Sequence, residues 1–387
     1  MSKKLFAVLG VLVMVSMILS ACAQPTAAPT EAPVAPTEAP APTEVPPTPE
    51  PKMLFGQVTD MGGVDDRSFN ALSWKGLTDA QAQLGVDAKY LESNQQSDYA
   101  KNIQQFLNEK VDLLVTVGFA LGVDTATAAK ANPDTKFAIV DYAFPDCFPG
   151  AVVGKDCGSD VELPNVFGFT YQTDEAALLA GMLAAGTSKS GVIGTYGGMN
   201  FPTVSIFMKG LEAGVKYYNQ LNGTNVKVLG WDTCKNDGTF TGNFSSTDDA
   251  RKITESMAQE GADVFMGVGG PIGQGSAAYC AETKSCTYIG VDADWYESVP
   301  QYKDIYLTSV LKKMDMSVFN VAKSVVDGTY KGGSKTYSLK DGGVDIAPAH
   351  DLASSVTPEL QAQVDQAKAD IISGKITVDG VLACPAP

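Results

Sequence analysis

The chain has 387 residues, and its 28 Lys and Arg residues oppose 44 Asp and Glu residues for a formal net charge of −16. An acidic chain repels phosphate, which argues against a nucleic-acid partner. The only histidine is His350, so multi-histidine zinc sites and a Ser-His-Asp triad with a spare base are excluded. We therefore expect that the protein is not a hydrolase.

The chain begins with the features of an export signal. Lys3 and Lys4 precede the apolar run LFAVLGVLVMVSMIL, which is too short to span a bilayer stably but suits a signal peptide over residues 1–21. The run ends in Leu-Ser-Ala-Cys at residues 19–22, which resembles a bacterial lipobox and predicts acylation of Cys22. A simple secretory signal is the alternative. We expect an exported protein, lipid-anchored on the extracytoplasmic face of the cell membrane.

Residues 22–52 predict a spacer between the lipid and the folded domain. The stretch 23–51 is a drifting Ala-Pro-Thr-Glu repeat with ten of the 21 prolines and no aromatic residue. It cannot form an apolar core, and proline at this density favours extended polyproline II. A ligand for a proline-recognising domain is the less favoured interpretation.

Six further cysteines in an exported chain predict disulfides. Spacing pairs Cys147 with Cys157 and Cys280 with Cys286 as local loops. Cys234 is then assigned to Cys384 by elimination.

From Met53 onward, short apolar runs alternate with stretches of helical periodicity, which predicts parallel sheets with right-handed crossovers. The alternation restarts after residue 173, so we expect an α/β fold of two doubly wound lobes with a ligand cleft between them. The expected first lobe is 53–170 plus 308–330, and the second is 171–307 plus 331–387. The hinge is expected at three crossovers, near residues 171, 307 and 331. The expected elements before residue 173 are, in chain order, strand MLFGQVTD, helix 70–84, strand DAKYLES, helix 97–110, strand VDLLVTVG, helix 124–131, and strands KFAIVDY and VFGFTY. The expected elements after it are helix EAALLAGMLAAG, strand SGVIGTYG, helix 204–219, strand VKVLGWD, helix 246–260, and strands ADVFMGVG, SCTYIGVD and IYLTSVL.

Ligands of such sheets bind beyond the carboxyl ends of the strands, so residues that directly follow a strand are candidates for the site. Four places qualify: TDMGGVDDRSFN after the first strand, Asp141, the loop 267–275, and Asp292. In the first of these, Asp66 or Ser68 could simply cap the next helix. A cap does not explain Phe69 beside Asn70, an aromatic face next to an amide that suits a flat heterocycle, although a core role is the simpler interpretation of Phe69 alone.

The glycine-rich loop 267–275 follows a strand and precedes a helix, yet it lacks the spacing of a dinucleotide- or phosphate-binding loop. Its backbone N–H groups could instead bind ligand hydroxyls. Asp292, Asp294 and Lys312 would supply charged partners for a vicinal diol, although a solvated helix face is an equally good interpretation of Lys312.

At this point the ordered set of segments resembles a known family. TDMGGVDDRSFN, FAIVD, TDEAALLAG, GVIGTYGG, the glycine loop, GVDAD and TSVLKKMD are similar to the basic membrane lipoprotein family, also called PnrA-like substrate-binding proteins. The resemblance covers residues 53 to about 330. It implies a fold like that of type I periplasmic binding proteins and delivery of nucleosides, chiefly purine nucleosides, to the transmembrane subunits of an ABC permease.

The resemblance also implies roles for individual residues. Phe69 would stack on the base, Asn70 and Asp141 would bind its edge, and a second aromatic would be Phe207, with Phe201 as the rival. Gly270, Asp292 and Lys312 would hold the ribose hydroxyls, with Asp294 as the rival of Asp292. The ligand-binding residues expected from the sequence are Asp60, Phe69, Asn70, Asp141, Phe207, Gly270, Asp292 and Lys312.

Several features depart from the family pattern. The three cysteine pairs and the insertion at residues 144–163 are not expected in the family, and the insertion lies near enough to the cleft to affect ligand choice. We expect a monomeric nucleoside-binding lipoprotein of an ABC importer, without enzymatic activity, metal or cofactor. A binding protein for a sugar or another polar metabolite is the alternative, and a nucleoside-cleaving enzyme is a more distant one.

Overall fold

The computed structural model describes residues 52–384. The predicted signal peptide, the predicted lipidation site Cys22 and all but the last residue of the proline-rich spacer lie outside the described residues. Within residues 52–384, no helix combines the length and apolarity that a bilayer crossing needs.

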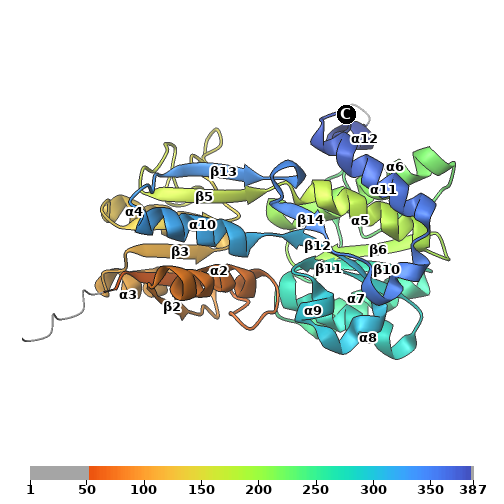
Figure 1. Cartoon of the computed structure of the whole chain (residues 1–387), viewed down its shortest axis with the longest axis horizontal. Helices are drawn as coiled ribbons and strands as arrows, with labels where there is room; N and C mark the ends of the chain where they lie inside the picture. Colours follow the sequence, from red (N-terminus) through yellow and green to blue (C-terminus); the bar gives the residue numbers. More distant parts are fainter. Residues whose placement is uncertain (1–51, 385–387) are drawn as a thin grey trace, which may run out of the picture. The chain divides into compact units, whose positions relative to one another are not determined.

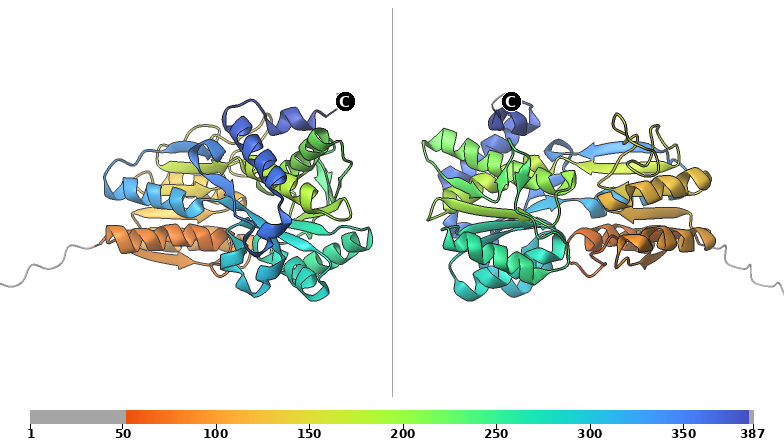
Figure 2. Two further views of the ribbon diagram at one scale, coloured as in Figure 1. Left: turned by 45° about the vertical axis from the view of Figure 1, so that its right-hand side comes forward. Right: turned by 180° about the vertical axis from the view of Figure 1, so that it is seen from behind.

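The first lobe is built on a six-stranded parallel sheet (Figure 1). Its helices form two pairs, because α2 packs against α10 and α3 packs against α4. The view from behind in Figure 2 shows the second pair in front of the sheet. The sheet has the order β13-β5-β4-β3-β1-β2, with β1 (Leu54–Val58), β2 (Asp87–Leu91), β3 (Leu113–Val117), β4 (Lys136–Val140), β5 (Val166–Tyr171) and β13 (Gly333–Tyr337), and the helices are α2 (Phe69–Leu84), α3 (Tyr99–Asn108), α4 (Gly122–Ala131) and α10 (Met314–Val326).

The second lobe repeats this plan with one antiparallel edge strand, β14. The sheet has the order β14-β12-β11-β10-β6-β7, with β6 (Val192–Gly197), β7 (Lys227–Leu229), β10 (Val264–Val268), β11 (Thr287–Asp292), β12 (Tyr306–Lys312) and β14 (Val344–Ile346). Strand β8 (Trp231–Asp232) pairs with β9 (Asp237–Gly238) in a separate hairpin. The helices of this lobe are α5 (Thr173–Thr187), α6 (Pro202–Asn222), α7 (Thr247–Gln259), α8 (Gly273–Thr283), α9 (Trp295–Ser298), α11 (Pro358–Ile372) and α12 (Val378–Leu382). Two parallel-sheet α/β lobes were predicted, and the structure confirms them.

Helices α5 and α6 form the closest helix contact of the second lobe, and small residues allow it. A Cβ atom on Gly214 would lie 2.0 Å from the carbonyl oxygen of Leu178, and one on Gly181 would lie 2.3 Å from that of Leu211. Helix α5 is accordingly buried along most of its length. This explains why its sequence, EAALLAGMLAAG, is apolar on every side rather than amphipathic.

The chain crosses between the lobes three times, between β5 and α5, between β12 and α10, and after β13. The second and third crossings differ from the boundaries expected at residues 307 and 331. Strand β12 pairs with β11 and β14, so residues up to Lys312 belong to the second lobe. Strand β13 pairs with β5, so residues up to Tyr337 belong to the first. An apolar run predicts a strand, but which sheet the strand joins depends on distant partners.

Three disulfides lie in the described residues, and they join the same pairs that the spacing suggested. Cys147–Cys157 closes the insertion of the first lobe, and Cys280–Cys286 links the end of α8 to the segment before β11. Cys234–Cys384 spans 150 residues and attaches the C-terminal end of the described chain to the β8–β9 hairpin. Each pair stays within one lobe.

The disulfides should differ in their contribution to stability. In the chain-entropy model, closing a loop of 150 residues stabilises by about 5 kcal/mol, whereas a loop of 10 residues stabilises by about 3 kcal/mol. The double variant Cys234→Ser with Cys384→Ser should therefore lose more free energy of unfolding than Cys147→Ser with Cys157→Ser, as measured by denaturant titration. Equal losses in the two double variants would contradict this ranking.

Candidate functional site

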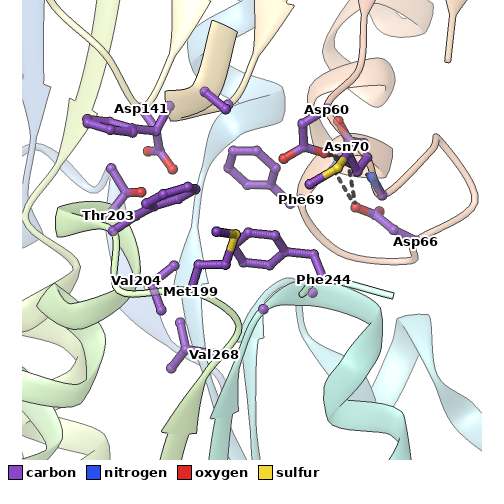
Figure 3. Close-up of a pocket in the computed structure, with 18 of the residues that line it drawn as sticks. Asp60, Asp66, Phe69, Asn70, Asp141, Met199, Thr203, Val204, Phe244 and Val268 are labelled. Carbon is purple, nitrogen blue, oxygen red and sulfur yellow. Dashed lines mark hydrogen bonds between the residues drawn. The ribbon is translucent and has the colours of Figure 1, made fainter. Parts of the chain in front are cut away.

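A cavity of about 190 Å³ lies between the carboxyl ends of the two sheets, and both lobes contribute to its wall (Figure 3). All eight residues expected to bind ligand line it, brought together from seven separate segments of the chain. Those residues are Asp60, Phe69, Asn70, Asp141, Phe207, Gly270, Asp292 and Lys312.

The turn before α2 forms one corner of the cavity. The carboxylate of Asp66 accepts hydrogen bonds from the backbone N–H groups of Ser68 at 2.9 Å, Asn70 at 2.7 Å and Ala71 at 3.0 Å. Asp66 is therefore the residue that caps α2. The hydroxyl of Ser68 instead faces the second lobe, where it donates to Asp292 Oδ2 at 2.9 Å.

The amide of Asn70 is oriented by two carboxylates. Its Nδ2 group donates to Asp60 Oδ1 at 2.7 Å and to Asp66 Oδ2 at 3.2 Å, which uses both N–H groups. Its Oδ1 atom is buried and has no hydrogen-bond partner among the described residues. Asn70 therefore has one unpaired acceptor, Oδ1, and no N–H group left to donate.

A buried ion pair joins the lobes across the cavity. Lys312 ends β12 of the second lobe, and Asp141 follows β4 of the first. Lys312 Nζ lies 2.5 Å from Asp141 Oδ1, and the two side chains are only 2% and 8% exposed. The interpretation of Lys312 as part of a solvated helix face is therefore wrong, because the residue is buried at the end of a strand.

Aromatic rings surround this ammonium group. Lys312 Nζ lies 4.8 Å from the ring centre of Phe69 and 5.9 Å from that of Phe207. Phe201 also lines the cavity and approaches Phe119 of the first lobe, with 5.5 Å between ring centres. Both candidates for the second aromatic wall, Phe207 and Phe201, are thus present in the second lobe.

Asp141 and Asp292 occupy equivalent places in the two lobes, the former directly after β4 and the latter at the end of β11. Both have left-handed backbone, with φ of 65° and 66°, a conformation that costs energy for residues other than glycine. Asp294, the rival of Asp292, does not line the cavity. Its carboxylate accepts from the N–H of Tyr296 at 3.1 Å and lies 2.8 Å from His350 Nε2.

The loop after β10 brings backbone rather than side chains to the cavity. Gly270 has a φ of 58°, and a Cβ atom there would point to within 3.9 Å of Asp66 Oδ2 in the other lobe. The positive φ favours glycine at position 270, whereas Gly267, Gly273 and Gly275 lie too close to packed neighbours to carry a Cβ atom. The glycine-rich sequence therefore needs no bound phosphate to explain it.

Burial shifts the titration of the carboxyl groups. It raises the pKa of Asp292 to about 6 despite the opposing effect of Lys312, and it raises the pKa of Asp66 to about 6 despite the three backbone N–H donors. Burial also raises the pKa values of Asp60 and Asp141. Four carboxyl groups thus share a cavity with a single ammonium group, Lys312. The charge balance favours an uncharged or cationic ligand over a phosphorylated one.

The sequence analysis missed several residues that line the cavity. Gln96 and Tyr99 follow β2, Phe119 follows β3, Met199 follows β6, and Phe244 lies before α7. Most of them obey the rule that led to the other candidates, since they come after the carboxyl end of a strand. Applying that rule to every strand, rather than to four, would have found them.

Within residues 52–384, no group of three or more His, Cys, Asp or Glu side chains is arranged to hold a metal ion.

Two parallel-sheet lobes with three crossovers and a cavity between them have the fold of type I periplasmic solute-binding proteins. The chain belongs to the family described as ABC transporter substrate-binding protein PnrA-like, whose model matches residues 55–380. A protein of Lactococcus lactis named ABC transporter nucleoside-binding protein BmpA is 33% identical and aligns with 83% of this chain and 87% of its own length. An uncharacterized lipoprotein of Pyrococcus abyssi is 31% identical over 74% of this chain and 66% of its own.

Solved structures agree with this class. A solute-binding protein of an ABC transporter system from Aeropyrum pernix superimposes with a TM-score of 0.73 at 25% identity, covering 84% of this chain and 92% of that one. A second such protein, from Conexibacter woesei, has a TM-score of 0.62 at 21% identity, covering 84% and 98%. At that identity the second likeness concerns the fold alone.

The raised pKa of Asp292 predicts a pH-dependent stability. The folded protein holds the proton up to about pH 6, whereas the unfolded chain releases it near 3.8, so the contribution of Asp292 to stability falls as pH rises through this window. The free energy of unfolding of the wild type, minus that of Asp292→Asn, should decrease by on the order of 2 kcal/mol between pH 4 and pH 7.

Urea titrations at several pH values would measure this difference. Ser68→Ala is the matched control, because it removes the hydroxyl that donates to Asp292 and leaves the carboxyl group in place. The control should keep a pH dependence of the same sign and show a larger one, because the Ser68 hydroxyl lowers the pKa of Asp292 in the wild type. A difference between wild type and Asp292→Asn that is constant or increases with pH would contradict the assignment.

Proposed function

We propose that this protein binds a nucleoside, with preference for purine nucleosides, and delivers it to the transmembrane subunits of an ABC importer. The observation that carries the proposal is the pairing, in one cavity, of aromatic faces with hydrogen-bonding groups from both lobes. Phe69 and Phe207 supply faces for a flat base, and Asn70, Asp141 and Asp292 supply polar partners. The relative from Lactococcus lactis, named a nucleoside-binding protein, supports the same ligand class.

In this proposal the two ends of the ligand meet different chemistry. The base lies against Phe69, and Asn70 and Asp141 bind its edge. The ribose hydroxyls bind Asp292, Lys312 and the backbone at Gly270. Asp60 acts on the ligand indirectly, because it accepts a hydrogen bond from Asn70 Nδ2 and fixes which atom of that amide faces the base.

The buried ion pair adds a condition to this arrangement. Asp141 and Lys312 are 2.5 Å apart, so a base at Asp141 and a ribose at Lys312 lie on either side of one contact between the lobes. A ligand that bonds to both groups is bound only when the lobes approach each other. Ligand binding then favours the closed arrangement through its greater affinity for that state.

Two alternatives have less support. A sugar would use Asp292 and Lys312, but it would leave the aromatic faces without a flat partner. Cleavage of a nucleoside would need a general acid or base beside the bond. His350 is paired with Asp294, which does not line the cavity, so only the buried carboxyl groups of the cavity, such as Asp292, could take that role. Our proposal is a monomeric binding protein with no catalytic step.

The lipid anchor forms part of the proposal. The sequence around Cys22 resembles a lipobox, and the relative from Pyrococcus abyssi is named a lipoprotein. Acylated Cys22 would hold the protein at the extracytoplasmic face of the membrane, and the proline-rich stretch would let the lobes reach the permease.

Binding of nucleosides by site variants tests the ligand assignment. Phe69→Ala should weaken all nucleosides by ~1–3 kcal/mol, because stacking depends little on the identity of the base. Asp292→Asn should weaken ribonucleosides and reduce any preference for ribose over deoxyribose, since it alters a partner of the sugar. Calorimetric titration with guanosine, adenosine, a deoxynucleoside and free ribose measures both effects.

Phe148→Ala is the matched control for Phe69→Ala, because Phe148 is an exposed phenylalanine outside the cavity wall. It should bind every ligand as the wild type does. Ribose that binds as tightly as guanosine, with Phe69→Ala without effect, would favour the sugar alternative. Release of free base from inosine during incubation would favour the enzyme.

The anchor is tested separately. Cys22→Ser should move the protein from the membrane fraction to the soluble or secreted fraction, because the thiol that carries the lipid is absent. Immunoblots of fractionated cells measure the distribution. Ser20→Ala is a suitable control, since it changes the neighbouring sequence and keeps the thiol. Unchanged membrane retention of Cys22→Ser would refute the lipid anchor.

A further inference from the structure

Tyr99 is a buried residue of the cavity wall whose hydroxyl group has no partner. It is the first residue of α3, in the connection that follows β2, and it lines the cavity. The side chain is 0% exposed, and its hydroxyl oxygen has no hydrogen-bond partner among the described residues. An unpaired buried hydroxyl is costly, so a group that approaches it from the cavity would gain a hydrogen bond at little further expense of desolvation.

The ring of Tyr99 is held in place by the core of the first lobe. It belongs to the apolar cluster that includes Val58, Ile103, Phe106 and Leu121. A hydroxyl on a ring packed in this way has little freedom to reach another partner. Its position is therefore set before a ligand arrives, which is the condition for a selective contact.

The hydroxyl group of Tyr99 can act as a hydrogen-bond donor. Burial and the nearby charge of Asp60 raise the pKa of Tyr99, so the group stays protonated at neutral pH. Asn70 offers the opposite type of group from the same lobe, since its Oδ1 atom is a buried acceptor without a partner. The first lobe thus has one unpaired donor and one unpaired acceptor, both on residues that line the same cavity. A purine edge carries both types of group, with ring nitrogens or a carbonyl oxygen as acceptors and N–H groups as donors.

We propose that the Tyr99 hydroxyl donates a hydrogen bond to an acceptor atom of the base and that it is a specificity-determining residue of the site. This assignment rests on the proposed nucleoside function. The Tyr99 hydroxyl would select a narrower class than nucleosides in general. The preferred base presents a ring nitrogen or a carbonyl oxygen toward α3 and donates an N–H group to Asn70. A base without an acceptor at that position would leave the hydroxyl unpaired in the closed cavity and would be discriminated against.

Tyr99→Phe gives a signature that separates a ligand contact from a structural role. Because the hydroxyl has no partner in the protein, its removal should leave the free energy of unfolding of the ligand-free protein unchanged or slightly increased. The same change should raise the Kd for guanosine or adenosine by about 5- to 100-fold, because the acceptor of the base is then buried without its donor.

Tyr330→Phe is the matched control. The hydroxyl of Tyr330 donates to the carbonyl oxygen of Phe137 at 2.6 Å, and Tyr330 does not line the cavity. This control should lose stability and keep the nucleoside affinity of the wild type, which is the reverse of the pattern expected for Tyr99→Phe.

Ligand analogues identify the acceptor atom. Wild type and Tyr99→Phe would be titrated calorimetrically with guanosine, adenosine, purine nucleosides in which N3 or N7 is replaced by C–H, and 2-aminopurine riboside, which lacks the 6-oxo group. For the analogue that lacks the relevant acceptor, the two proteins should have equal affinity. For the others, the variant should be weaker by the same factor as for the parent nucleoside.

The outcomes that overturn the proposals are distinct. Tight binding of nucleosides by the wild type, with no change in Tyr99→Phe, would overturn the role of Tyr99 and leave the proposed function intact. An equal loss for every analogue would place the contact outside the base and overturn it too. A loss of stability in Tyr99→Phe like that of Tyr330→Phe would assign the hydroxyl a structural role. No binding of any nucleoside by the wild type would overturn the proposed function and the assignment with it.

Discussion

The buried ion pair between Asp141 and Lys312 is the contact on which the arrangement of the site depends. Each partner comes from a different lobe, and neither is exposed enough to be solvated while the pair is formed. Removing two charges from water costs about as much as their attraction returns, so such a pair adds little net stability. Loss of either partner is nevertheless costly, because a single charge left buried in the cavity without its counter-ion is strongly unfavourable. The pair therefore specifies how the lobes meet without holding them together strongly.

Because the ion pair adds little net stability, closure of the lobes depends on the binding of a ligand. When the lobes separate, both charges regain water, and the free energy of opening remains small. A ligand that satisfies the unpaired groups of the cavity, such as Asn70 Oδ1, adds interactions that exist only in the closed arrangement. The aromatic rings of Phe69 and Phe207 lie close to the Lys312 ammonium group, shield it from water and line the same cavity. Two of the six buried polar atoms without partners in residues 52–384, Asn70 Oδ1 and the Tyr99 hydroxyl oxygen, belong to residues of the cavity wall.

The two-lobed fold and part of the candidate site could be predicted from the sequence, because the periodicity of apolar residues is a local property. Alternation of strands and helices gave the two-lobed fold, and the residues after strands gave Phe69, Asn70, Asp141 and Asp292 as candidates. The contact between Asp141 and Lys312 could not be predicted, because it depends on how two sheets face each other. The limits of the lobes near Lys312 and Tyr337 were misplaced for the same reason, since sheet membership is decided by long-range pairing. Tyr99 was overlooked because the segment after β2 is polar and has no motif.

The disulfides have a consequence for how the molecule would respond to mechanical and thermal stress. All three pairs lie inside a lobe, and none bridges the cavity. Oxidation therefore stiffens each lobe as a body and adds no restraint to the movement of one lobe against the other. The stability of each lobe and the freedom of the lobes to open are therefore set by separate parts of the chain, so sequence changes can strengthen one without restraining the other.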